Sequence, residues 1–199
     1  MKNLLDKNYW EARYQRHETG WDIGTVSNPL KAYIDQLPDK NISILVPGCG
    51  NAYEAEYLLA KGFTNVTLAD ISPSLVEALK KKFTTEDQQK IHIICANFFE
   101  LRSTYDLVLE QTFFCALEPR LRKTYADKMF ELLNDKGRLA GVLFSRHFEG
   151  GPPFGGNQEE YLALFEPRFA IKVMEECYNS IPPRAGTELF FILEKKRGV

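Results

Sequence analysis

The stretch SILVPGCGNAYEAEYLLAKG, residues 43–62, indicates the fold. Its apolar, β-branched run at 42–47 is typical of a strand that is buried on both faces. Gly48 and Gly50 then form a tight turn, and the helix that follows is expected to end at Gly62. A strand, a glycine turn and a helix in succession are the first unit of a parallel α/β sheet.

Strand-like and helix-like segments alternate along the rest of the chain. Strands are predicted at 65–70, 91–96, 105–111, 137–146, 169–177 and 187–195, and helices after Asp6, after the Ser72-Pro73 pair, after Pro119 and around 158–165. This order predicts a mostly parallel sheet with helices on both faces, and an antiparallel addition at one edge. In such sheets, ligands bind beyond the carboxyl ends of the strands.

The composition is that of an ordinary globular domain. With 199 residues, 44% of them hydrophobic, and a formal net charge of −2, residues 1–199 are expected to form one domain that binds neither nucleic acid nor membranes. The sequence shows neither a signal-peptide run nor the roughly 20 apolar residues of a membrane span. Its four scattered cysteines favour free thiols over a zinc site, so we expect a cytoplasmic protein without a metal.

The glycine turn has an acidic partner. Asp70 ends the next predicted strand, 70 − 50 = 20 residues beyond Gly50, where a carboxylate can accept hydrogen bonds from both ribose hydroxyls of a nucleotide-like cofactor. The third glycine of a dinucleotide fingerprint is replaced by Tyr53, which would obstruct a diphosphate. This favours S-adenosylmethionine, which has no phosphate. The alternative is an incidental turn with Asp70 capping a helix.

Several motifs together resemble the thiopurine-methyltransferase-like proteins, and within them the plant-type halide and thiol methyltransferases. The resemblance covers almost the whole chain and rests on YWEARYQRHETGWDIG (9–24), LVPGCG (45–50), ADIS (69–72), NFFEL (97–101), EQTFFCALEPRLR (110–122), EGGPPF (149–154) and IPPRAG (181–186). It implies a class I S-adenosylmethionine-dependent methyltransferase fold, Rossmann-like, with a seven-stranded sheet. The implied reaction moves a methyl group to a small soft nucleophile: a thiol or thiolate, a halide or thiocyanate.

The resemblance also implies how the cofactor is held. Residues 1–30 would form a lid, with Trp10, Tyr14 and Trp21 against the cofactor, because aromatic faces attract a sulfonium cation. The alternative for Trp10 and Tyr14 is an aromatic pair that packs on a helix face. Gly48 and Gly50 would present backbone to the amino-acid end of the cofactor.

The resemblance places the remaining cofactor contacts at the ends of the strands predicted at 65–70 and 91–96. Asp70 and Ile71 would hold the ribose, and Asn97 and Phe98 would meet the adenine. Two positions depart from the family pattern: many relatives have an acid at Asn97, and the plant enzymes usually have an aromatic residue at Gln111, near the reacting methyl. Asn97 keeps an acceptor oxygen, whereas Gln111 would offer a polar contact in place of the aromatic ring. A capping Asn97 is the alternative.

An anionic acceptor needs no general base, and the sequence shows no evident catalytic dyad. The expected acceptor wall is Arg146 with His147, which would attract a small-molecule anion, while Phe144 and Phe148 keep it dry. A surface pair between Arg146 and Glu149 is the alternative. We expect a monomer.

Two other functions compete with this interpretation. One is an NAD(P)-dependent oxidoreductase, which the missing third glycine disfavours. The other is a non-catalytic S-adenosylmethionine-binding module, since this architecture hosts many activities.

Overall fold

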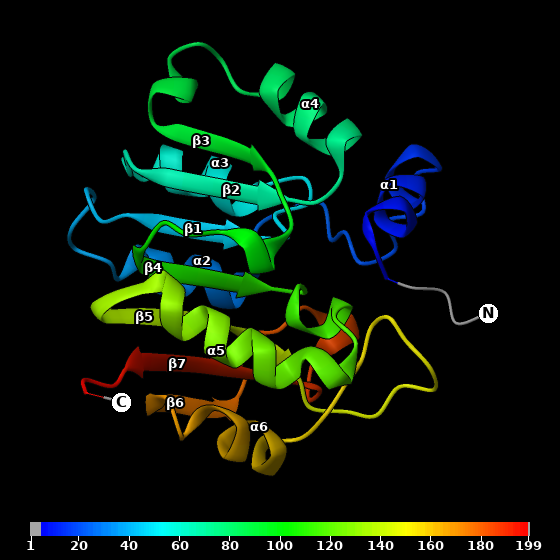
Figure 1. The fold of residues 1–199 in the computed structure, drawn as a ribbon, viewed down its shortest axis with the longest axis vertical. Coiled ribbons are helices and arrows are strands. Elements are labelled where there is room, and N and C mark those ends of the chain that lie inside the picture. Colours follow the sequence, from blue (N-terminus) through cyan, green and yellow to red (C-terminus); the bar gives the residue numbers. More distant parts are fainter. Residues whose placement is uncertain (1–4, 199) are drawn as a thin grey trace.

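The computed structural model describes residues 5–198 and contains one seven-stranded sheet in the order β3-β2-β1-β4-β5-β7-β6 (Figure 1). The strands are β1 (Ile44–Pro47), β2 (Val66–Asp70), β3 (Ile91–Cys95), β4 (Tyr105–Gln111), β5 (Leu133–Phe144), β6 (Phe169–Glu176) and β7 (Glu188–Lys195). The predicted parallel α/β sheet is therefore confirmed.

The first five strands pair in parallel, and their order reverses direction at β1, which lies between β2 and β4. β7 runs antiparallel to both β5 and β6, with β6 outermost, so the antiparallel addition lies at this edge, as predicted. The carboxyl ends of β1 to β5 consequently meet along one side of the molecule.

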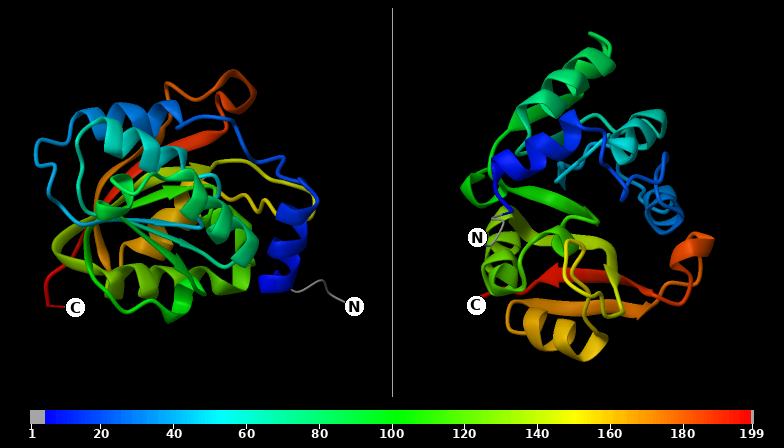
Figure 2. Two further views of the ribbon diagram at one scale, coloured as in Figure 1. Left: turned by 90° about the horizontal axis from the view of Figure 1, so that it is seen from above. Right: turned by 90° about the vertical axis from the view of Figure 1, so that its right-hand side faces the viewer.

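Helices cover the two faces of the sheet. They are α1 (Lys7–Gln15), α2 (Asn28–Asp35), α3 (Tyr53–Ala60), α4 (Pro73–Lys82), α5 (Arg122–Leu132) and α6 (Gln158–Phe165). One buried cluster joins α2, α3 and α4 to the sheet, and a second joins α5 and α6 to its other face. In Figures 1 and 2, α1 stands apart from both layers, beyond the carboxyl ends of the strands.

Local sequence explains where the helices begin. Ser72 Oγ accepts a hydrogen bond of 3.3 Å from the amide of Leu75, and Pro73 occupies the first turn of α4, as predicted. Asp6 likewise caps α1 by accepting a 3.0 Å hydrogen bond from the amide of Tyr9. These side chains satisfy amide groups that a helix leaves without internal partners.

Two elements differ from the prediction. α2 was not among the predicted helices, and its capping residue, Ser27, makes no side-chain capping bond. The strand predicted at 137–146 begins earlier, because α5 ends at Leu132 and β5 starts at Leu133. Lys136 turns the chain there in the left-handed region, at φ +63°, so Gly137 lies inside the strand.

Candidate active site

A cavity of about 1160 Å³ lies beyond the carboxyl ends of the parallel strands, under the segment that contains α1. Eleven of the twelve predicted site residues line it: Trp10, Tyr14, Trp21, Gly48, Gly50, Asp70, Ile71, Asn97, Phe98, Gln111 and Arg146. His147 is exposed and is not among the lining residues. Residues from six separate segments thus meet in one space.

The glycine turn has a geometry that only glycine adopts without strain. Gly48 and Gly50 lie at φ +56° and +50°, in the left-handed region. A Cβ on Gly48 would lie 2.4 Å from Cδ2 of Phe113, so the turn also requires close packing at this position. A Cβ on Gly50 would lie 3.6 Å from the Tyr14 hydroxyl, which shows how closely α1 approaches the turn.

Asp70 is 6% exposed and faces the turn. Its Oδ1 accepts a 3.0 Å hydrogen bond from the amide of Ser72, and its Oδ2 accepts a 3.4 Å hydrogen bond from the amide of Gly50. Burial raises the pKa of this carboxyl, and the two amide hydrogen bonds oppose that rise. The predicted pairing of the acid with the glycine turn is therefore present in the fold.

The predicted aromatic residues of the N-terminal segment form one cluster. Trp21 meets Trp10 and Tyr14 edge to face, with ring centroids 5.6 and 5.8 Å apart. Burial is the main cause of a raised pKa at Tyr14, so its hydroxyl stays protonated. The three rings pack on one another, as the aromatic-packing alternative expects. They also line the cavity, as a lid over the cofactor would require.

Hydrogen bonds connect this segment to the sheet. Glu11 Oε2 accepts a 2.6 Å bond from Ser72 Oγ and a 3.1 Å bond from the amide of Ser74, at the beginning of α4. Asp22 Oδ2 accepts hydrogen bonds from the Asn51 side chain and, at 3.3 Å, from the Tyr53 hydroxyl. The segment is thus attached beside Asp70 and beside the glycine turn.

Asn97 and Phe98, the residues predicted to contact the adenine, come directly after β3 in the chain. Asn97 Oδ1 accepts a 3.1 Å hydrogen bond from the amide of Phe99 and caps a short 3-10 helix, η2 (Phe98–Glu100), so the capping alternative is realised. Phe98 is buried, and its ring lies 5.1 Å from that of Phe113. Both predicted residues nevertheless line the cavity, together with Ile71.

Gln111 ends β4 and is held in place by Ser27. Ser27 Oγ donates a 2.8 Å hydrogen bond to Gln111 Oε1, which leaves the amide hydrogens of Gln111 as the polar group available to the cavity. The next residue, Thr112, has φ +57°, in a region that non-glycine residues rarely adopt. The chain therefore turns sharply where this part of the cavity begins.

The far end of the cavity combines aromatic rings with two guanidinium groups. Phe144 and Phe148 meet edge to face at 5.1 Å. The guanidinium of Arg146 lies 4.7 Å from the centre of the Phe148 ring, and no ion pair joins Arg146 to Glu149 within the described residues. His147 lies beyond the end of β5 and is exposed.

Sequence reasoning did not single out Arg184, although it lies in the IPPRAG motif. Its guanidinium lies 5.4 Å from the centre of the Phe144 ring and pairs with Glu188 at 3.4 Å. Its Nη2 donates a 3.0 Å hydrogen bond to the carbonyl oxygen of Trp21. Arg184 therefore connects the far end of the cavity with the N-terminal aromatic cluster.

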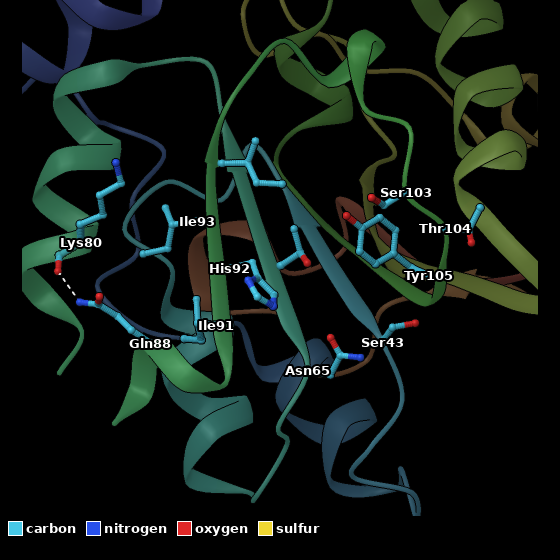
Figure 3. Close-up of a pocket in the computed structure, with 12 residues that line it drawn as sticks. Ser43, Asn65, Lys80, Gln88, Ile91, His92, Ile93, Ser103, Thr104 and Tyr105 are labelled. Carbon is cyan, nitrogen blue, oxygen red and sulfur yellow. Dashed lines mark hydrogen bonds between the residues drawn. The ribbon is translucent and has the colours of Figure 1, made fainter. Parts of the chain in front are cut away.

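A second hollow, of about 630 Å³, lies at the opposite ends of the strands (Figure 3). Its walls include Ser43 and Asn65, which precede β1 and β2, and His92 in the edge strand β3. β3 and β4 are joined without an α-helix, which leaves this face of the sheet open. None of the predicted site residues lies there.

Comparisons with known proteins agree with this geometry. The thiopurine S-methyltransferase family model matches residues 5–195. The chain is 32% identical to a probable thiol methyltransferase 2 of Arabidopsis thaliana over 185 residues, covering 90% of this chain and 81% of that protein. It is 28% identical to thiocyanate methyltransferase 1 of the same plant, covering 94% and 85%.

Solved structures share the fold. The 1,6-didemethyltoxoflavin-N1-methyltransferase of Burkholderia thailandensis, solved with S-adenosylhomocysteine, superposes with a TM-score of 0.75 at 18% identity, covering 96% of this chain and 87% of that one. The magnesium protoporphyrin IX methyltransferase of Synechocystis, with bound S-adenosylmethionine, gives a TM-score of 0.71 at 14% identity, covering 98% and 100%.

Fold, site and comparisons define a class I methyltransferase that depends on S-adenosylmethionine. The oxidoreductase alternative is not favoured. Within that class, the chain belongs to the thiopurine S-methyltransferase family. The described residues contain no helix that could cross a membrane.

Proposed function

We propose that the protein methylates a small soft nucleophile, such as a thiolate, thiocyanate or halide. The observation that supports this most strongly is one continuous cavity with a carboxylate and a glycine turn at one end and two guanidinium groups between aromatic rings at the other. Both plant relatives carry names of enzymes that act on thiols or thiocyanate.

The donor end fits S-adenosylmethionine. Asp70 would accept hydrogen bonds from the ribose hydroxyls beside Ile71, and Asn97 with Phe98 would flank the adenine. Gly48 and Gly50 line the cavity and would present backbone to the amino-acid end. Residues 5–30 of the predicted lid would place Trp10, Tyr14 and Trp21 over the cation; residues 1–4 of that lid lie outside the described part of the chain.

The acceptor end fits an anion. Arg146 and Arg184 would supply positive charge, and the rings of Phe144 and Phe148 would exclude water from the nucleophile. Arg184 replaces His147 in this role, because His147 does not line the cavity. Gln111 would offer its amide hydrogens between the two ends.

S-adenosylmethionine, when bound, supplies a methyl group that a nucleophile takes by in-line displacement. A soft anion is already nucleophilic, so the protein residues position and desolvate it rather than remove a proton. Cys115 lines the cavity but is buried, and burial raises the pKa of its thiol, which keeps it protonated and unreactive. We propose one methyltransferase domain over residues 1–199, acting as a monomer in the cytoplasm.

Thermal unfolding with S-adenosylhomocysteine, NAD or NADP tests the donor, and methyl transfer from S-adenosylmethionine to thiocyanate, iodide, sulfide and aryl thiols tests the acceptor. Stabilisation by S-adenosylhomocysteine alone, with turnover of at least one acceptor, is expected. Binding without turnover of any acceptor would instead support the non-catalytic module.

A further inference from the structure

Glu110 is a fully buried acid near the end of β4 that accepts three hydrogen bonds. Its Oε1 accepts bonds of 2.8 Å from the amides of both Phe113 and Phe114, and its Oε2 accepts a 2.6 Å bond from the Tyr125 hydroxyl. All three partners are donors, so the arrangement fits the ionised carboxylate. Glu110 itself is not among the described residues that line the cavity.

The two amide bonds close a turn that does line the cavity. Gln111, Thr112 and Phe113 form this turn, and each of them lines the cavity wall. Thr112 has φ +57°, a conformation that persists only where its surroundings hold it. Hydrogen bonds to an ionised acceptor are about twice as strong as bonds to a neutral one. The charge on Glu110 therefore holds the turn more firmly than a neutral side chain would.

The turn lies between the two ends of the cavity. On the donor side, a Cβ on Gly48 would lie 2.4 Å from the ring of Phe113. On the acceptor side, the carbonyl oxygen of Cys115, just after the turn, accepts a 2.7 Å hydrogen bond from the amide of Phe154, in the same loop as Arg146. In-line transfer requires donor and acceptor aligned about 3–3.5 Å apart. A displaced turn would disturb that alignment.

Neutral groups surround the Glu110 carboxylate. In the described part of the chain, the titratable side chains whose charge bears on it are Tyr125, from α5, and Cys115, and burial raises the pKa of both. The neighbouring strand β5 places Gly141 opposite it. Burial raises the pKa of Glu110 to about 7, while the three hydrogen bonds oppose that rise. Both protonation states of Glu110 are therefore populated near neutral pH.

We propose that Glu110 is a positioning residue for methyl transfer: its ionised carboxylate fixes the turn at 111–113 between donor and acceptor, although it touches neither. This inference rests on the proposed function, because it assumes methyl transfer in the cavity. A residue that only supported the fold would alter stability without setting the pH dependence of the reaction. The positioning role instead predicts that transfer is lost when the carboxylate becomes neutral.

The pH dependence of methyl transfer at saturating S-adenosylmethionine tests this role. The acceptor is thiocyanate, iodide or a nitro-substituted aryl thiolate, because these anions do not titrate in the range used. In the unmodified protein, kcat/KM for the acceptor should fall about tenfold for each pH unit below about pH 7, as one required ionisation predicts. Glu110→Gln keeps the shape of the side chain without its charge. Its kcat/KM should be independent of pH between about 5.5 and 8, and about tenfold or more below that of the unmodified protein at pH 8.

Two further variants separate this role from general effects. Glu54→Gln is the matched control, because Glu54 is another buried acid whose pKa burial raises to about 7, but it lies in α3, away from the turn. This variant should keep the fall in activity below about pH 7. Tyr125→Phe removes a hydrogen bond that lowers the pKa of Glu110, so the midpoint of the fall should move to higher pH.

A fall with an unaltered midpoint in Glu110→Gln would overturn the positioning role while leaving the proposed function intact. So would an unmodified protein whose transfer to these anions does not depend on pH over the same range. If Glu110→Gln does not fold, Tyr125→Phe decides, and an unmoved midpoint would refute the role. Failure to methylate any of the three anions would instead overturn the proposed function, and the positioning role with it.

Discussion

The Glu11 carboxylate accepts a 2.6 Å hydrogen bond from the hydroxyl of Ser72, across 61 positions of the chain. The amide of the same serine donates a 3.0 Å hydrogen bond to Asp70. One residue thus contacts both the N-terminal segment and the acid proposed to hold the ribose. Attachment of α1 and the order of the ribose site should therefore depend on each other.

Replacing Glu11 with Gln should weaken S-adenosylhomocysteine binding several-fold, because the charged acceptor of the Ser72 and Ser74 bonds is lost. Calorimetry measures the affinity, and hydrogen exchange at the amides of α1 should quicken in the variant. Glu18→Gln, an exposed change in the same segment, serves as the control. Unchanged exchange in α1 would show that this contact does not hold the segment.

The attachment of α1 should also depend on pH. The hydrogen bond from Ser72 is the main reason that the pKa of Glu11 lies below its ordinary value of 4.5. A lowered folded-state pKa stabilises the attached state above the ordinary pKa, and that contribution is lost as the pH falls through the folded-state value. Exchange in α1 should thus be independent of Glu11 ionisation between pH 6 and 8 and should quicken in acid, below about pH 4.5.

Asp70→Ala should weaken the binding of S-adenosylhomocysteine by about 1.5–3 kcal/mol, since ribose hydroxyls would lose a charged acceptor. Calorimetry on the folded variant measures this loss. Glu77→Ala changes an exposed acid that pairs with Lys80 on the adjoining helix, and should leave the affinity unchanged. An unaltered affinity for the Asp70 variant would remove the ribose assignment.

Gly48→Ala should destabilise the fold by about 2–5 kcal/mol, because it adds left-handed strain to an overpacked contact with Phe113. Urea unfolding measures the free energy of unfolding. Gly20→Ala is the matched control, because no heavy atom lies within 4 Å of its Cβ position and its φ is not positive. Comparable stability of both variants would contradict the packing described for the turn.

Gln111→Tyr should raise kcat/KM for iodide relative to an aryl thiol by about tenfold, since a ring desolvates a soft anion more fully than an amide does. Steady-state methyl transfer to the two acceptors gives the ratio. The variant also loses the hydrogen bond from Ser27, so Ser27→Ala isolates that loss. A similar ratio in both variants would assign the effect to positioning rather than to the ring.

Local signals in the sequence predicted the framework well. Ser72-Pro73 marks the beginning of α4 because its capping bond needs only neighbouring residues. The position of Asp70 at the end of β2 followed from a short buried strand and a spacing of 20 residues. Contacts within one strand-turn-helix unit are visible in such patterns because their geometry is fixed locally.

Glu54 and Arg184 show where sequence reasoning ends. Glu54 looks like an ordinary acid in the first turn of a helix, and only the packing of distant segments buries it. Arg184 reaches the cavity because β7 returns antiparallel beside β5, which sets the loop before it against Phe144. Long-range packing determines both positions, and no local pattern encodes it.

The hydrogen bond from Arg184 to the carbonyl oxygen of Trp21 has a kinetic consequence. Any movement of the N-terminal segment that opens the cofactor site would break this contact at the acceptor wall. We therefore expect an ordered sequence in which the donor enters first and the acceptor second, the methylated product leaves third and the spent donor leaves last.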